Sequence, residues 1–245
     1  MLAVIGGSGL TSFEGLEQVR RRAIATPYGE PSCPLTFGRL KGADMVFLAR
    51  HGDGHTLAPH RINYRANIHA LKEAGAQAIV SVATVGGIRA VFGPGVLVVP
   101  DQILDYTWGR ASTFFEEPGS PVTHIDFTHP YDEPLRHRIL EAARRARVEV
   151  AGGGVYATTQ GPRLETSAEI DRLERDGADL VGMTGMPEAA LAREAGLPYA
   201  ALAAVVNHAA GRGESSEAIS LERIHAVLGE AMVRVRRILE EMVIP

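Results

Sequence analysis

Residues 180–211 read LVGMTGMPEAALAREAGLPYAALAAVVNHAAG. Two runs are almost entirely apolar: residues 179–183, which begin one residue before this stretch, and a second run that ends at Asn207. Strands covered on both faces of a sheet have this composition. Between the two runs, Pro187 suits the first turn of a short helix and Gly196 suits its end. The stretch therefore predicts an α/β fold built from buried strands and short helices.

Polar residues follow these runs at only two places, Met183-Thr184-Gly185 and Asn207-His208. In open α/β sheets, ligands bind beyond the carboxyl ends of strands. The two turns are therefore candidates for a binding site. A plain structural interpretation stays open, because turns are polar in every strand-helix-strand unit.

Apolar runs and helical periodicity predict the rest of the fold. Strands are expected at 2–5, 44–49, 78–82, 96–99 and 155–159, and helices at 63–73, 133–148, 166–176 and from Ser220 onward. No repeat, low-complexity tract or linker divides the chain, so we expect one domain over residues 1–245. Residues 106–130 show no regular pattern, and a loop of this length is usually functional or a contact surface. We expect it to face a partner.

Two helix starts carry further signals. Thr166 and Glu169 form a capping box. Glu165 stands just before it, and its carboxylate suits either the positive end of that helix or a ligand. The last helix carries apolar residues at helical spacing, which predicts a face buried in the core: Leu221, Ile224, Leu228, Met232, Val235 and Leu239.

The composition is that of an ordinary globular protein, with 45% hydrophobic and 22% charged residues. A formal charge of −4 argues against nucleic acid as the main partner. The single cysteine, Cys33, excludes an internal disulfide. The start of the chain does not resemble a signal peptide, and no run is long enough for a membrane helix. We expect a soluble cytoplasmic protein without membrane contact.

Two glycine-containing stretches suit an anion. Gly6-Gly7-Ser8-Gly9 follows the first strand, where backbone N–H groups and the serine hydroxyl could contact a phosphate. Arg50 and His51 follow the strand at 44–49, and a guanidinium matches phosphate geometry. Two alternatives stay open: a metal site formed by His51, Asp53, His55 and His60, and a histidine phosphatase that uses Arg50-His51-Gly52.

The sequence resembles the methylthioadenosine phosphorylase and purine nucleoside phosphorylase family from Ile5 to the last helix. The motifs that carry the resemblance are GGSGL (6–10), ARHG (49–52), NYRANIHALK (63–72), GPRLET (161–166), MTGMPE (183–188) and VVNH (205–208). The resemblance implies a single α/β domain with a twisted mixed sheet flanked by helices, assembled as a homotrimer. It also implies a pentosyltransferase of purine salvage, which cleaves a nucleoside with inorganic phosphate as co-substrate and needs no metal or other cofactor.

The resemblance also implies roles for single residues. Phosphate would be held by Ser8, Arg50, His51, Thr184 and Thr84, or by Ala83 in place of Thr84. Met183 would lie against the ribose. His124 would enter the site of a neighbouring subunit.

The base and sugar pockets combine features of different members. Adenine-specific members read T-D-Y-D where this chain has Val206-Asn207-His208-Ala209, and 6-oxopurine members have an Asn there and a Glu corresponding to Glu165. Asn207 would act in catalysis at N7 of the base, and Glu165 would accept from N1–H. At the sugar end, Ile219 and Leu221 stand where 6-oxopurine members have a His for the 5′-hydroxyl.

We therefore expect a 6-oxopurine nucleoside with an apolar 5′-methylthio group as substrate, bound in part by His208 and Ala209. The alternatives are a general inosine/guanosine phosphorylase, a methylthioadenosine phosphorylase, the histidine phosphatase named above, and a nucleoside-binding module without turnover.

Overall fold

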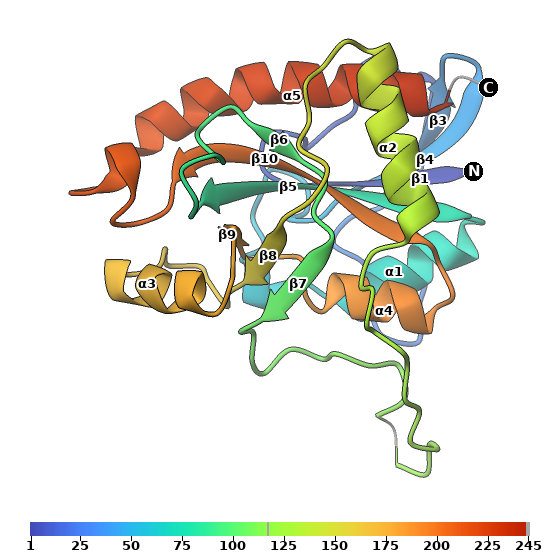
Figure 1. The fold of residues 1–245 in the computed structure, drawn as a ribbon. Helices are drawn as coiled ribbons and strands as arrows, with labels where there is room; N and C mark the ends of the chain where they lie inside the picture. The colour runs from blue at the N-terminus through green and yellow to red at the C-terminus, as the bar shows by residue number, and fades with distance from the viewer. Residues whose placement is uncertain (117, 244–245) are drawn as a thin grey trace.

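The computed structural model describes residues 1–116 and 118–243, which form a twisted mixed sheet with helices on both faces (Figure 1). The strands are β1 (Leu2–Gly6), β2 (Glu17–Arg22), β3 (Leu35–Leu40), β4 (Ala43–Ala49), β5 (Ala78–Gly87), β6 (Leu97–Val98), β7 (Gln102–Asp105), β8 (Val155–Thr158), β9 (Leu180–Gly182) and β10 (Tyr199–His208). The helices are α1 (Tyr64–Glu73), α2 (Glu133–Arg145), α3 (Ser167–Arg175), α4 (Glu188–Glu194) and α5 (Leu221–Val243), with short 3-10 turns at Pro59–Arg61 and Gly213–Ser215.

Helices cover the central strands from two sides, which is why those strands are apolar on both faces. On one side, α2 and α5 pack against the sheet through residues such as Ile139 and Val235. On the other side, α1 and α4 pack through residues such as Ile68 and Leu191. Helix α3 covers β8 and β9 separately. The expected fold class, a single α/β domain with a mixed sheet between helices, is confirmed.

The sheet changes its pairing in the middle of β5. The first residues of β5 pair in parallel with β1, up to Ser81, while the whole strand pairs in parallel with β10. At Gly86 and Gly87 the edge next to β1 is taken by β9, which runs antiparallel. In between, residues 82–85 have no strand partner on that edge in the described chain. This gap places one edge of β5 beside open space.

The strands β9 and β10 therefore run in opposite directions, which corrects the simple strand-helix-strand unit expected for residues 180–211. Because β9 is antiparallel to β5, the chain after it returns along the gap, and Met183-Thr184 lies towards the middle of β5. Because β10 is parallel to β5, Asn207 lies at the far end, beside Gly86. The two polar turns therefore lie at different positions along β5, one beside each of its edges.

Other differences concern elements without an apolar signal. The strand β2 is exposed at all six positions and includes Arg20–Arg22, so its sequence resembles a loop. The strand β5 continues through Gly86-Gly87, where glycine is needed: a Cβ on Gly87 would lie 1.8 Å from the carbonyl oxygen of Phe92. The strand β7 was also not expected.

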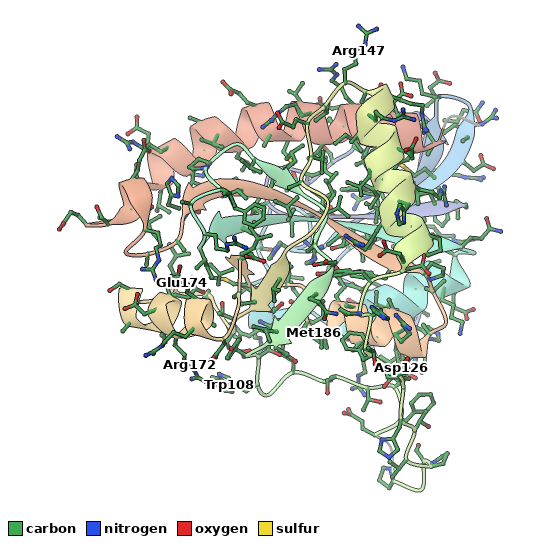
Figure 2. All side chains as sticks on the ribbon, viewed as in Figure 1. Trp108, Asp126, Arg147, Arg172, Glu174 and Met186 are labelled. Atoms are coloured by element: carbon green, nitrogen blue, oxygen red, sulfur yellow. The ribbon has the colours of Figure 1, made fainter. Side chains whose placement is uncertain are left out.

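The described part of the segment from Thr107 to Tyr131 contains no helix or strand, as expected. It extends away from the sheet in Figure 1, although Phe114 and Phe127 pack against the α1–α4 core. Trp108 is 71% exposed and lies at the outer edge of the molecule near Arg172 of α3 (Figure 2). No described helix has the length and apolar character that crossing a bilayer requires.

Candidate active site

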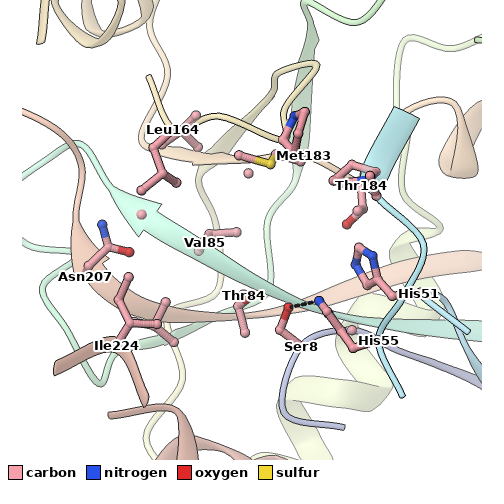
Figure 3. A pocket seen from close by; sticks show the side chains of 18 of the residues that line it. Ser8, His51, His55, Thr84, Val85, Leu164, Met183, Thr184, Asn207 and Ile224 are labelled. Carbon is pink, nitrogen blue, oxygen red and sulfur yellow. Dashed lines mark hydrogen bonds between the residues drawn. The ribbon is translucent and has the colours of Figure 1, made fainter. Parts of the chain in front are cut away.

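A cavity of about 580 Å³ opens along the unpaired edge of β5 (Figure 3). Most of the predicted site residues line it, although they come from seven separate parts of the chain. The residues from that prediction are Ser8, Arg50, His51, Thr84, Glu165, Met183, Thr184, Asn207, Ala209, Ile219 and Leu221. The topology therefore brings together in one place the turns that the sequence singled out separately.

One end of the cavity is rich in hydroxyl and imidazole groups. Ser8, His51, Thr84 and Thr184 lie on this side in Figure 3, each on the turn or strand from which the sequence predicted it. Gly7 makes this approach possible, because a Cβ there would lie 2.8 Å from Nη1 of Arg50. Small hydrogen-bonding groups around a concave space suit a tetrahedral oxyanion.

Arg50 is the main correction to the predicted phosphate site. Its guanidinium is buried and donates from Nε and Nη2 to Glu188, at 2.8 and 3.1 Å. It also donates from Nη1 to the carbonyl oxygen of Val82 and from Nη2 to Oγ of Ser81. Burial lowers the pKa of Arg50, but the Glu188 carboxylate raises it by more than burial lowers it. The net shift is upward, so Arg50 stays charged. Arg50 is thus part of a buried ion pair, and its guanidinium is not held in reserve for phosphate alone. Removing Arg50 would therefore affect the stability of the fold as well as the affinity for phosphate.

His51 is held by its backbone surroundings. Its Nδ1 lies 2.8 Å from the carbonyl oxygen of Leu57, which can only accept, so Nδ1 carries the proton and Nε2 is free. Burial, with a contribution from the nearby Arg50 charge, lowers the pKa of His51 to about 4. The ring is therefore neutral at neutral pH.

His55 was not predicted as a phosphate residue, yet it lines the same end of the cavity. Its ring centroid lies 4.3 Å from that of His51, and its Nε2 lies 3.5 Å from Oγ of Ser8. Burial and then the Arg50 charge lower its pKa as well. The sequence signal that could have indicated this position of His55 is the pair of glycines between His51 and His55. Gly52 and Gly54 have φ of 75° and 73°, and they turn the chain back so that the two rings come into contact.

The cavity also presents an amide group, that of Asn207, on the side away from His51 (Figure 3), and the carboxylate group of Glu165. Asn207 donates from Nδ2 to the carbonyl oxygen of His208 at 2.6 Å, which leaves its Oδ1 available to a ligand. Glu165 accepts from Oγ1 of Thr159 at 2.6 Å. The capping box is confirmed, and Glu169 makes it with Thr166, so the cap does not require the carboxylate of Glu165.

The start of α5 forms an apolar side of the cavity through Ile219, Leu221 and Ile224. This corrects the expectation that the whole stripe of α5 is core. Met232 and the members after it are buried, but Leu221 is 64% exposed. The helix extends past the end of the sheet in Figure 1, so its first turn faces the cavity and solvent.

Two predicted residues do not line the cavity. His208 follows Asn207 on β10, and neighbouring strand residues point to opposite sides; its ring lies where a Cβ on Gly93 or Gly213 would contact it, at 3.5 and 2.6 Å. Its assignment to the substrate is therefore corrected. His124 is exposed on the segment 107–131, and its role in a neighbouring subunit stays a prediction.

The structure gives no support to the metal alternative. No group of three or more His, Cys, Asp or Glu side chains within residues 1–116 and 118–243 could hold a metal ion. Asp53, one of the four candidate ligands, pairs instead with Arg21 at 2.8 Å.

Three comparisons with known proteins bear on this site. Residues 1–244 match the model of the phosphorylase superfamily. A protein of Xanthomonas campestris pv. campestris named probable S-methyl-5′-thioinosine phosphorylase is 58% identical over 216 residues, which cover 88% of this chain and 86% of that protein. A probable 6-oxopurine nucleoside phosphorylase of Thermococcus kodakarensis is 46% identical over 86% of this chain and 80% of that protein. The structure of methylthioadenosine phosphorylase from Schistosoma mansoni in complex with adenine superimposes with a TM-score of 0.94 at 34% identity, over 99% of this chain and 90% of that one.

Proposed function

This chain belongs to the phosphorylase superfamily, and from that premise we propose that it cleaves S-methyl-5′-thioinosine with inorganic phosphate. The products are hypoxanthine and S-methyl-5-thioribose 1-phosphate. The observation that carries the proposal is the set of groups that share one cavity. Hydroxyls and imidazoles gather at one end, Asn207 and Ile224 lie on the other side (Figure 3), and Glu165 and the apolar start of α5 also line the cavity. These match phosphate, a 6-oxopurine and a methylthio group in turn.

The proposed reaction uses these groups at the two ends of the glycosidic bond. As the bond to the base breaks, the sugar becomes oxocarbenium-like and hypoxanthine gathers negative charge. Asn207 stabilises the leaving base at N7, to which the second N–H of its Nδ2 can donate. Once solvent water has protonated N7, Oδ1 of Asn207 accepts from N7–H, while Glu165 accepts from N1–H. Phosphate, held near Ser8 and Thr184, attacks C1′ from the opposite face. Groups placed where charge develops typically contribute about 10²–10³ in rate.

The experiment that tests the proposal follows hypoxanthine release from S-methyl-5′-thioinosine with and without phosphate. We expect turnover only with phosphate, and formation of one sugar phosphate for each base released. Release at the same rate in phosphate-free buffer would indicate a hydrolase and contradict the proposal. Lack of turnover in both buffers would favour a binding module.

A second expectation concerns the 5′ group. We expect kcat/KM for S-methyl-5′-thioinosine to exceed that for inosine by about 10–200-fold, because a methylthio group contacts Ile219, Leu221 and Ile224 where inosine places a hydroxyl. Leu221→His should narrow this ratio by giving the hydroxyl a partner. Preference of the unchanged protein for inosine would favour a general inosine/guanosine phosphorylase.

We further propose that the active form is a homotrimer in the cytoplasm, with residues 1–245 acting as one domain. The support is the exposed segment 107–131, whose Trp108 and Val122 are 71% and 83% exposed. Contact with a neighbouring copy would bury these side chains and bring His124 to a second site.

A further inference from the structure

The phosphate end of the cavity has almost no positive charge to offer an anion. Among the described residues that line the cavity, only two belong to the types Arg, Lys, Asp and Glu: Arg50 and Glu165. The charge of Arg50 is already matched by Glu188, which is fully buried and bonded to it. His51 and His55 are neutral at neutral pH, because burial and Arg50 lower both pKa values.

Phosphate at neutral pH carries between one and two negative charges. Moving such an ion out of water is costly unless charge or hydrogen bonds in the site compensate it. The hydroxyls of Ser8, Thr84 and Thr184 supply hydrogen bonds but no charge. A proton taken from solvent by an imidazole would supply both.

The two imidazoles are placed for this purpose. Leu57 holds Nδ1 of His51, so a proton can add only at Nε2, and that addition turns an acceptor into a charged donor. Nε2 of His55 faces Oγ of Ser8 across 3.5 Å (Figure 3). Because the ring centroids are 4.3 Å apart, a charge on one ring disfavours a second charge on the other. The pair can therefore hold one proton but not two.

We propose that phosphate binds together with one proton, which the His51–His55 pair takes up from solvent, and that His55 is a further phosphate-binding residue. The inference rests on the proposed function in that phosphate is the co-substrate. No covalent bond forms or breaks in this step. The charged groups that face the pair are Arg50, from the end of β4, and Glu188, from α4; they form an ion pair with each other and stay ionised.

The sign of the pH dependence follows from proton uptake. In the free protein both rings are neutral at pH values above their lowered pKa values, whereas the bound pair is protonated until the pH passes its raised pKa in the complex. Affinity is therefore greatest at low pH and falls as pH rises, by about tenfold per pH unit where one proton is taken up. Sulfate is the sharper probe, because it stays a dianion in this range and cannot bring the proton itself.

The test is calorimetric titration of the protein with sulfate and with phosphate at about pH 7.5 in two buffers of different ionisation enthalpy. From the difference in heat we expect uptake of about one proton per sulfate, and less for phosphate, whose monoanion brings a proton. His55→Gln should weaken sulfate binding by about ten- to a hundredfold, the loss of one charge-assisted hydrogen bond, and reduce the uptake. His60→Gln is the matched control: His60 is exposed just before the helix α1, does not line the cavity, and should bind like the unchanged protein.

The outcomes separate this inference from the proposed function. If the protein cleaves S-methyl-5′-thioinosine with phosphate but the heat of anion binding is the same in both buffers, no proton is taken up. The fixed dipoles of the site then suffice to bind the anion, and the inference is wrong. It is equally wrong if His55→Gln binds sulfate like His60→Gln. If the unchanged protein neither binds these anions nor cleaves the nucleoside, the proposed function fails as well.

Discussion

Replacing Arg50 by methionine should lower the free energy of unfolding by about 3–5 kcal/mol, because it leaves a buried charge without a partner. Arg50 is 1% exposed and Glu188 is fully buried. In the unchanged protein Glu188 accepts from Arg50, from Ser81 at 2.7 Å and from Tyr199 at 2.8 Å. The two hydroxyls cannot neutralise the carboxylate. Urea denaturation followed by far-UV circular dichroism measures the loss.

Two further variants test the cause. The double variant Arg50→Met with Glu188→Leu should recover a large part of the loss, because replacing both partners of a buried pair by apolar residues is often close to neutral. Arg21→Met removes one partner of an exposed pair, Arg21 with Asp53 at 47% and 61% exposure, and should cost at most about 1 kcal/mol. An Arg50→Met protein as stable as the unchanged one would contradict the importance of the pair.

The apolar runs predicted the centre of the fold well. The strands β1, β4 and β5 begin within one residue of the expected starts, and β10 ends one residue after the expected end at Asn207, because burial on both faces leaves a continuous apolar signal. The strand β2 could not be found in this way, since its backbone pairs at the sheet edge while all its side chains face solvent. The direction of β9 was also hidden, because three apolar residues carry no information on which neighbour they pair with.

Single site residues could be predicted where their position depends on the neighbouring sequence alone. Ser8 and Thr184 each follow a strand whose end the sequence marks, Asn207 lies next to the last residue of β10, and all three line the cavity. The pairing of Arg50 with Glu188 joins positions 138 residues apart, and no local pattern indicates it. The one hint is that Glu188 opens a helix whose residues are otherwise mostly small and apolar.

Side-chain direction at the end of β10 was harder to predict. Its pairing with β5 shifts register between Val205 and Asn207, so that counting alternate residues from the start of the strand fails there. His208 consequently points away from the cavity while Asn207 lines it. The sequence motif alone, without the direction of each side chain, predicts that both Asn207 and His208 contact the substrate.

The largest effect that we expect is selection of the base. The protein should prefer S-methyl-5′-thioinosine over methylthioadenosine by about 10⁴–10⁵ in kcat/KM, as sites built around a hydrogen bond do. A 6-oxopurine offers a protonated N1, whereas N1 of adenine is a lone pair that would face the carboxylate of Glu165. Thr159 holds that carboxylate with a 2.6 Å hydrogen bond, so it is fixed in place and cannot turn away at little cost. An unpaired carboxylate in the filled cavity is what penalises adenine.

Asn207 strengthens this selection, because its neutral amide brings no charge to hold a protonated N7 of adenine, as an aspartate would. Both nucleosides should therefore be measured on the unchanged protein, on Glu165→Ser, on Asn207→Asp and on the double variant. Glu165→Ser should remove the mismatch with adenine N1, and Asn207→Asp should add the missing acceptor, so that the double variant gains most on methylthioadenosine. Arg163→Gln is the control, because Arg163 lies in the same loop but pairs outward with Glu169. Similar rates on both nucleosides for the unchanged protein would refute the assignment, and a double variant without any gain would place selectivity in other residues.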